Sequence, residues 1–157
     1  MEEKLAKAQV ADINELIVIN PAIVKEDTPI REMLESIIKD TRSRHAYVVD
    51  KHNKLIGSIR INNVIQYLFP STILKEQQNS PKVGSFMDYL NARVAGDIMS
   101  MRPNYVFKDT PLDRMVDIMI EDKSNELPVV NKEMEVIGEV NVLEVIAYAL
   151  QNNETTN

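Results

Sequence analysis

The 157-residue sequence contains no cysteine, no tryptophan and only four glycines. The lack of cysteine excludes disulfides, thiol catalysis and cysteine-ligated zinc. Basic residues number 18 against 24 acidic residues, and the resulting net charge of −6 argues against binding to a nucleic-acid backbone. No apolar run approaches the ~20 residues that a membrane span needs, and the charged N-terminus lacks the apolar core of a signal peptide. We therefore expect a cytoplasmic protein that binds no nucleic acid and does not insert into a membrane.

What the chain does contain is an internal repeat. Residues 20–29 resemble residues 102–111 without a gap, and three shorter matches follow in the same order. These are 47–50 with 128–131, 55–57 with 136–138, and 64–67 with 145–148, with one residue dropped to keep the copies in step. Because self-similarity of this kind indicates the architecture before any local motif does, we expect two similar modules packed as a pair.

Each copy predicts strand, helix, strand, strand and helix in that order. The first helix follows Asp-Thr-Pro, where Thr28 and Thr110 are expected to be N-caps with proline at the first helical position. A hairpin pattern comes next, and its second strand contains Gly57 or Gly138, which indicates a bulge or a close approach by another group. The apolar helix stripes are Ile30, Met33, Leu34, Ile37 and Ile38 in one copy, and Leu112, Met115, Val116 and Met119 in the other.

These elements predict an α+β fold with small sheets covered by helices. The predicted divisions are an N-terminal helical segment at 1–13, a first repeat at 14–69, a linker at 70–93, a second repeat at 94–151 and a disordered tail at 152–157. The linker is expected to contain short helical pieces near 71–74 and 86–90. A connection of this length is uncommon inside a compact domain.

The ordered motifs point to a known family. The second copy contains Gly96-Asp97-Ile98-Met99, Asp109-Thr110-Pro111, Leu127-Pro128-Val129-Val130 and Val136-Ile137-Gly138. The first copy contains Asp27-Thr28-Pro29, Ala46-Tyr47-Val48-Val49-Asp50 and Leu55-Ile56-Gly57. Taken together, the set resembles a tandem pair of cystathionine-beta-synthase (CBS) domains. The resemblance implies two βαββα CBS repeats packed through their sheets with pseudo-two-fold symmetry, and a homodimer.

The resemblance also implies a regulatory function. Family members commonly bind AMP, ATP or S-adenosylmethionine in clefts between the repeats and signal to a regulated partner. The family's ligand contacts come from the extended lead-in segment, the middle strand and a Gly-x-Thr-x-x-Asp motif after the last strand. In the first repeat these positions are Pro21, Ala22, Ile23, Arg44, His45, Ala46, Tyr47, Arg60 and Asn63. In the second repeat they are Arg102, Asn104, Tyr105, Leu127, Pro128, Asn141 and Glu144.

Both copies depart from the Gly-x-Thr-x-x-Asp motif. Arg60 and Asn63 stand at the Thr and Asp positions of the first copy, and Asn141 and Glu144 stand there in the second. Arginine suits a phosphate through bidentate contact. Asparagine still bonds a ribose hydroxyl but lacks the charge assistance of a carboxylate. Glu144 keeps the carboxylate of the motif's Asp but on a side chain that is one methylene longer.

A basic cluster before the middle strand distinguishes the two copies. Arg42, Arg44 and His45, together with Arg60, would form an anion-friendly pocket, so an anionic nucleotide is expected to prefer the first repeat. Two interpretations stay open here, since these residues also fit a solvated polar turn, and Arg60 also fits a solvated residue paired with a nearby acid.

Other functions receive less support from the residues. Tyr47 and Tyr105 fit stacking on a base and fit packing equally well. The chain has no His-x-x-x-His, nucleophile elbow or phosphate-cradling loop, so we expect no enzyme, no metal site and no required cofactor. A ligand-independent dimeric scaffold for a transporter or enzyme is the main alternative, favoured by the altered ribose motifs. A divalent-cation sensor is the weaker one.

Overall fold

The computed structural model describes residues 6–17, 19–68 and 92–153, and these fall into two compact units. The first-repeat unit contains residues 21–68 and 92–103, and the second-repeat unit contains residues 6–17, 19–20 and 104–153. The predicted linker lies outside the described residues except at positions 92 and 93. None of the helices in the described part has the length and apolar character of a membrane span.

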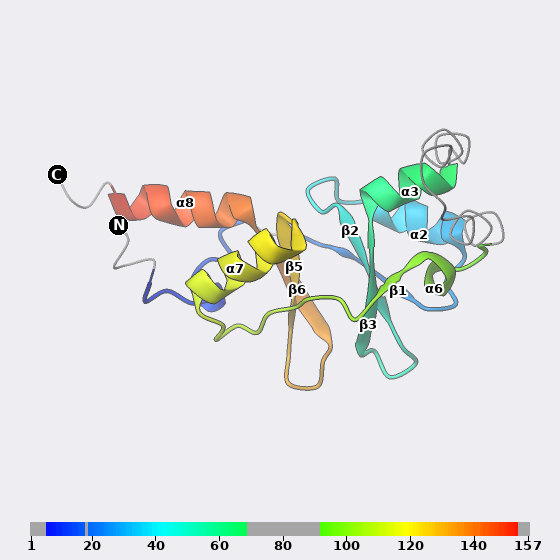
Figure 1. Cartoon of the computed structure of the whole chain (residues 1–157), viewed down its shortest axis with the longest axis horizontal. Coiled ribbons are helices and arrows are strands. Elements are labelled where there is room, and N and C mark those ends of the chain that lie inside the picture. Colours follow the sequence, from blue (N-terminus) through cyan, green and yellow to red (C-terminus); the bar gives the residue numbers. More distant parts are fainter. Residues whose placement is uncertain (1–5, 18, 69–91, 154–157) are drawn as a thin grey trace. The chain divides into compact units, whose positions relative to one another are not determined.

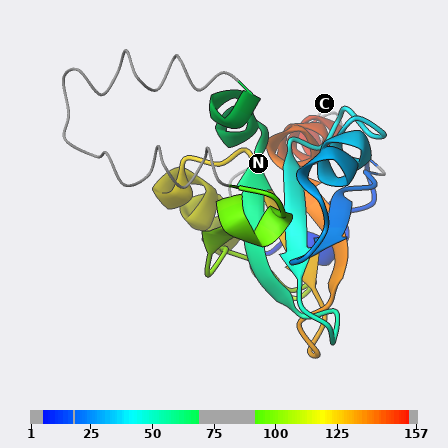
Figure 2. The same ribbon diagram turned by 90° about the vertical axis from the view of Figure 1, so that its right-hand side faces the viewer.

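The first-repeat unit is a four-stranded sheet with helices packed against it (Figure 1). Its strands, in spatial order, are β1 (Ala22–Lys25), β2 (His45–Val49), β3 (Leu55–Arg60) and β4 (Ser100–Met101). β1 runs parallel to β2, while the other neighbours are antiparallel. Its helices are α2 (Ile30–Ile37), α3 (Ile61–Leu68) and α6 (Ala95–Ile98). The short α6 lies against β1 and β3 (Figure 2).

The second-repeat unit repeats the hairpin and the helices. Its elements are a 3-10 helix (Val10–Asp12), α7 (Leu112–Asp122), β5 (Glu126–Val130), β6 (Val136–Asn141) and α8 (Val142–Asn153). In place of a β1 equivalent, Val106 forms a single parallel bridge with Val129. The predicted α+β class with two repeats is therefore confirmed. In the described part of the predicted 1–13 helical segment, only residues 10–12 are helical, in the 3-10 form, and α8 runs past the predicted repeat end at 151 to Asn153.

Each unit completes its core with a segment from the start of the other repeat or from just before it. The contributed residues are Ala92, Ala95 and Ile98 in the first-repeat core, and Ala8, Val10 and Ile13 in the second-repeat core. The attachment is alike in both units, with Ala95 N donating to Thr28 O at 2.8 Å and Val10 N donating to Thr110 O at 3.0 Å. Burial of apolar surface stabilises both attachments. The compact units consequently differ from the two repeats as read along the sequence.

The helix caps differ from the prediction. The N-cap residues of α2 and α7 are Pro29 and Pro111, so the prediction of threonine caps is wrong. The hydroxyls of Thr28 and Thr110 instead accept a hydrogen bond from the backbone N–H three residues earlier, at 2.9 Å in both units. Threonine side chains bond nearby backbone groups in turns as readily as at helix starts. Each threonine therefore closes the turn that leads into its helix.

The predicted helix stripes are largely confirmed. The residues that face the cores are Ile30, Met33 and Ile37 of α2, and Leu112, Met115 and Met119 of α7. Leu34 and Val116 are partly buried against the same cores. Ile38 was predicted to belong to the stripe, but α2 ends at Ile37 and the Ile38 side chain is exposed. An expectation based on period 3.6 holds only while the helix continues.

The predicted role of the strand glycines is also confirmed. The register between the paired strands shifts between Val48 and Val49 beside Gly57, and between Val129 and Val130 beside Gly138. A Cβ atom on Gly57 would overlap the side chain of Met99. The first hairpin thus combines a bulge with a close approach, and the second contains a bulge, as isolated strand glycines indicate.

Candidate functional site

The sheet of the first-repeat unit gathers the candidate residues of that repeat at one end. β1 and β2 pair Ala22 with Ala46, and the β2–β3 pairing places His45 opposite Arg60. Pro21 immediately precedes β1, and Arg44 immediately precedes β2. All of these positions lie at the N-terminal ends of β1 and β2 and the C-terminal end of β3. The spatial grouping that the family motif implies is therefore present in the first repeat.

The alternation of side chains divides this group between two faces of the sheet. Ala22 and Ala46 belong to the hydrophobic core, so only their backbone groups are available to a ligand. Ile23 points to the opposite face and is exposed. Tyr47 shares that face with His45, and their rings stack with centroids 5.9 Å apart and planes within 2°. One face of the tyrosine ring thus packs against protein.

The basic residues near this end have different surroundings. Arg42 makes a bidentate pair with Asp40, from Nε to Oδ1 at 2.8 Å and from Nη2 to Oδ2 at 2.7 Å. This pair raises the pKa of the Arg42 guanidinium and neutralises its charge toward other anions. The Arg44 carbonyl accepts a hydrogen bond from Ile61 N at 2.9 Å, which ties the start of β2 to the start of α3. Arg60 ends β3 directly before that helix.

Asn63 occupies the first turn of α3, three positions after Arg60. A helix start presents backbone N–H groups and a partial positive charge. An arginine and an asparagine beside such a start are suited to bind a phosphate and a ribose hydroxyl, respectively.

The second repeat uses the same two positions for a capping box. Asn141 Oδ1 accepts hydrogen bonds from Leu143 N at 2.8 Å and from Glu144 N at 3.3 Å. In return, Asn141 N donates to Glu144 Oε2 at 2.9 Å. This reciprocal pattern, with a cap residue and a glutamate three positions later, satisfies the free N–H groups at the start of α8. Both side chains are buried and already engaged with the backbone.

Burial changes the acidity of Glu144. Its side chain is 0% exposed, and desolvation raises its pKa from 4.5 to about 7, although backbone N–H groups of Asn141 and Ile17 act in the opposite direction. Its Oε1 has no hydrogen-bond partner of normal geometry among the described residues. Near neutral pH this group can therefore hold or release a proton inside the second-repeat unit.

The remaining second-repeat candidates are only partly brought together. Val106 N donates to Pro128 O at 3.0 Å, which places Tyr105 and Asn104 beside the middle of β5. Tyr105 packs edge-on against Phe107 with ring centroids 5.6 Å apart. Leu127 lies in the hydrophobic core. Arg102 belongs to the first-repeat unit and has a left-handed backbone, with φ of 57°.

Sequence reasoning missed two features. The Asn-x-x-Glu spacing at 141–144 is itself a helix-start signal, and it could have identified the capping box. The second feature is a pair of hollows at the hairpin ends of the two units, one lined by residues that include Phe107 and Lys132 and the other by residues that include Lys25 and Lys51. No motif marks these hollows, because their residues lie in turns far apart in the sequence.

The fold and the repeated site define a tandem-repeat module of the α+β class. The CBS domain family model matches residues 10–70 and 95–151, and the chain belongs to this family. The curated protein "CBS domain-containing protein CBSX1, chloroplastic" of Arabidopsis thaliana is 26% identical over 140 residues, which cover 82% of this chain. The match spans 59% of that relative's length.

Solved structures show the same fold. A CBS domain-containing protein from Thermotoga maritima is 30% identical, with a TM-score of 0.71. The match covers 92% of this chain and 95% of that one. CBSX2 from Arabidopsis thaliana, solved in complex with AMP, is 22% identical with a TM-score of 0.66, covering 92% of this chain and 98% of that one. The CBS domain pair of protein MJ0100, in complex with 5′-methylthioadenosine and S-adenosyl-L-methionine, is 21% identical with a TM-score of 0.66 and the same coverage.

Proposed function

We propose that this protein is a regulatory module that binds an adenosine-containing nucleotide, either AMP- or ATP-like or S-adenosylmethionine, at the first-repeat site and signals to a partner protein. The observation that carries the proposal is the pairing of His45 with Arg60 beside Ala22 and Ile23, which gathers the family's ligand positions at one sheet end. The AMP in CBSX2 and the S-adenosyl-L-methionine in the MJ0100 pair support the ligand class.

The chemistry of the first-repeat site suits such a ligand. β1 is the edge strand of its sheet, and edge strands present backbone groups that a base can meet. Arg60 and Arg44 supply guanidinium groups for a phosphate, and Asn63 supplies an amide for a ribose hydroxyl. We propose that binding favours one arrangement of the module over another, because a ligand shifts such an equilibrium only through its differential affinity for the two states.

The second-repeat site is less suited to a nucleotide. Its Asn141 and Glu144 form the capping box of α8, so a ligand would have to compete with backbone hydrogen bonds for the same atoms. Buried polar groups give up such partners only at a cost of about 1–3 kcal/mol each. We therefore propose that the first repeat is the principal nucleotide site.

Calorimetric titration with AMP, ATP and S-adenosylmethionine tests this function. We expect at least one ligand to bind with Kd below about 1 mM, which corresponds to ~4 kcal/mol.

Arg60→Gln should weaken binding of a phosphate-containing ligand about tenfold or more, because a hydrogen bond to a charged group contributes ~1.5–3 kcal/mol. The matched control is Arg31→Gln, which removes an exposed guanidinium paired with Glu35 on α2 and should leave affinity unchanged.

The outcome that contradicts nucleotide sensing is the absence of binding by all three ligands at millimolar concentration. Equal weakening by Arg60→Gln and Arg31→Gln would instead contradict the assignment of the site. A simpler check is the absorbance of the denatured, freshly purified protein, because a chain without tryptophan makes co-purified nucleotide easy to detect.

A ligand-independent dimeric scaffold is the second candidate function. The capping box favours it, since one of the two family sites is used to hold a helix. In that case, capture of a partner transporter or enzyme would be equally efficient with and without nucleotide.

We propose a non-catalytic role in both cases, with no required cofactor. The cytoplasmic location stays a prediction, because the curated relative CBSX1 is described as chloroplastic.

A further inference from the structure

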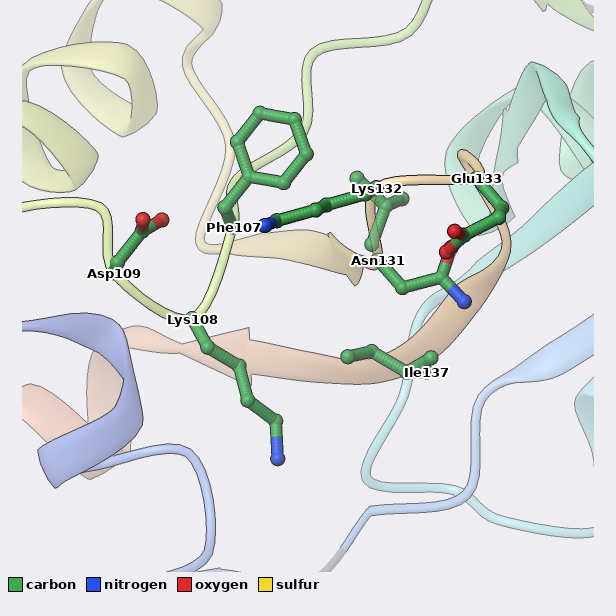
Figure 3. A pocket seen from close by; sticks show the side chains of 8 residues that line it. Phe107, Lys108, Asp109, Asn131, Lys132, Glu133 and Ile137 are labelled. Atoms are coloured by element: carbon green, nitrogen blue, oxygen red, sulfur yellow. The ribbon is translucent and has the colours of Figure 1, made fainter.

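A second pocket lies in the second-repeat unit, at the far end of the hairpin from the capping box. It has a volume of about 560 Å³ and opens where β5 ends and β6 begins (Figure 3). Val130 pairs with Val136 at this end, whereas Glu126 pairs with Asn141 at the other. Four residues of strand separate the two ends by about 13 Å, at ~3.3 Å per residue. The pocket is therefore distinct from the nucleotide positions of this repeat.

The floor of this pocket is apolar. Phe107 and Val130 line it from the segment before α7 and from β5, and Ile137 lines it from β6. Val130 is buried, Phe107 is partly buried, and Ile137 remains 46% exposed. Small-molecule sites are typically hollows of ~300–1,000 Å³ with apolar walls and a few polar groups. This hollow has a volume within that range and an apolar floor.

The rim of the pocket carries charges of both signs. Lys132 and Glu133 come from the hairpin turn, and Lys108 and Asp109 come from the turn before α7. Figure 3 shows the Lys132 side chain extending across the pocket toward Phe107. Within the described residues, Lys132, Glu133 and Asp109 have no hydrogen bond or ion pair, while Lys108 Nζ lies 3.9 Å from Glu15 Oε1. Two ammonium and two carboxylate groups thus surround an apolar floor.

The equivalent hollow of the first-repeat unit provides an internal comparison. It has a similar volume of about 530 Å³, but Lys25 stands where Phe107 stands in the second repeat. The Lys25 ammonium donates to Asp50 O at 3.0 Å and to Asn53 Oδ1, so the Lys25 side chain links the segment before α2 to the hairpin turn. The second repeat has lost that cationic bridge and gained an aromatic floor. Only the second-repeat hollow combines an aromatic floor with a rim of balanced charge.

We propose that the second-repeat pocket binds a free amino acid with an apolar or aromatic side chain. The ligand side chain lies on Phe107 and Ile137, the carboxylate faces the ammonium of Lys132, and the ligand ammonium faces Asp109 or Glu133. A ligand with a single charge would pair with only the ammonium groups or only the carboxylate groups of the rim. This inference goes beyond nucleotide sensing and does not depend on it.

The test is a titration of the uniformly 15N-labelled full chain with L-phenylalanine or L-leucine, followed by backbone amide shifts. We expect saturable shifts at residues 107–109 and 130–133 with millimolar or tighter affinity. N-acetyl-L-phenylalanine and L-phenylalaninamide should each bind at least fivefold more weakly, because each lacks one of the two charges. Absence of shifts at 10 mM would overturn the proposal, as would equal binding of all three phenylalanine compounds.

Two variants test the assigned residues. Lys132→Met should weaken L-phenylalanine binding at least fivefold, while the matched Lys51→Met in the first-repeat hollow should leave it unchanged. Phe107→Lys recreates the first-repeat arrangement and should abolish binding, with a spectrum that remains dispersed. Retained affinity in Phe107→Lys would overturn the proposal. AMP shifts centred on residues 44–47 report the nucleotide site separately, so failure of one function is distinguishable from failure of the other.

Discussion

At the start of α8, Glu144 is subject to two opposing electrostatic effects. Backbone N–H groups and the helix dipole favour its ionised form, whereas complete burial disfavours it. Burial prevails, and the pKa rises to about 7. The same residue therefore caps a helix and titrates near neutral pH. This combination follows from the depth of the capping box, since an exposed capping glutamate would keep an ordinary acidity.

The raised pKa predicts a stability change with a definite sign. Below about pH 4.5 the carboxyl is protonated in both the folded and unfolded chain, and stability is unaffected. Between about 4.5 and 7 only the unfolded chain ionises, so the free energy of unfolding falls as pH rises, by on the order of 3 kcal/mol in total. Glu144→Gln keeps the capping geometry and should remove this contribution. Its advantage in Tm over the natural chain should grow from pH 4.5 to 7.5.

The control for this titration is Glu121→Gln, an exposed glutamate on α7 of the same unit. It should leave the pH dependence of Tm unchanged, as measured by circular dichroism in matched buffers. Parallel Tm curves for Glu144→Gln and the natural chain would contradict the assignment of this proton to Glu144.

At the scale of elements, the two short segments before the repeats act as exchanged core pieces. Asp12 Oδ2 accepts from Gln9 N at 2.8 Å, and Asp97 Oδ2 accepts from Val94 N at 3.0 Å, so both segments turn in the same way. A second bond from Arg93 N and this one together lower the pKa of Asp97. The repeat thus extends to residues 8–13 and 92–98, although these segments serve opposite cores.

The exchanged segments predict where truncation of one side chain is costly. Ile13 is fully buried in the second-repeat core, so Ile13→Ala should lower the free energy of unfolding by about 2–5 kcal/mol through lost burial and a residual cavity. Leu16→Ala, at an exposed position just after this segment, should cost about 0.5 kcal/mol or less. Urea unfolding measures both values. Equal losses would contradict a core role for this segment.

At the scale of the whole molecule, α8 leaves an apolar stripe exposed. Leu143, Ile146 and Leu150 are each at least half exposed and share one helix face at spacings of three and four residues. An adjoining hollow of about 480 Å³ between α7 and α8 is lined by Val116, Met119 and Val145, among others. Exposed apolar surface of this kind marks an interaction site. We propose that a second copy of the chain covers it in the homodimer that the family resemblance implies.

The dimer proposal predicts a change in mass. Ile146→Asp places a charge in the centre of the stripe and should convert the protein from dimer to monomer in sedimentation velocity at micromolar concentration. Gln151→Asp adds the same charge at an exposed position outside the stripe and should leave the dimer intact. A monomeric natural chain, or a dimer that survives Ile146→Asp, would contradict the proposal.

The sequence by itself determined the repeat, the α+β class, the helix stripes and the hairpins. These depend on periodicity and turn residues within a few positions, as in the Met33 and Met115 helices or the Gly57 and Gly138 hairpins. It also indicated the family, because the motifs occur in order and twice. The grouping of the first-repeat candidate residues was partly predictable for the same reason, since strand order places His45 opposite Arg60 once the hairpin is recognised.

Only the tertiary structure decided how the chemistry is distributed. The Asn-x-x-Glu spacing at 141–144 indicates a capping box locally, but the complete burial that raises the pKa of Glu144 comes from tertiary packing. The exchange of residues 8–13 and 92–98 between cores, and the pocket floored by Phe107 and Ile137, involve residues far apart along the chain. Such contacts depend on which surfaces become buried together after folding, and this information is absent from local patterns. The duplication supplied two copies of one scaffold, residue differences such as Lys25 against Phe107 gave the copies different chemistry, and tertiary packing decided which groups those residues contact.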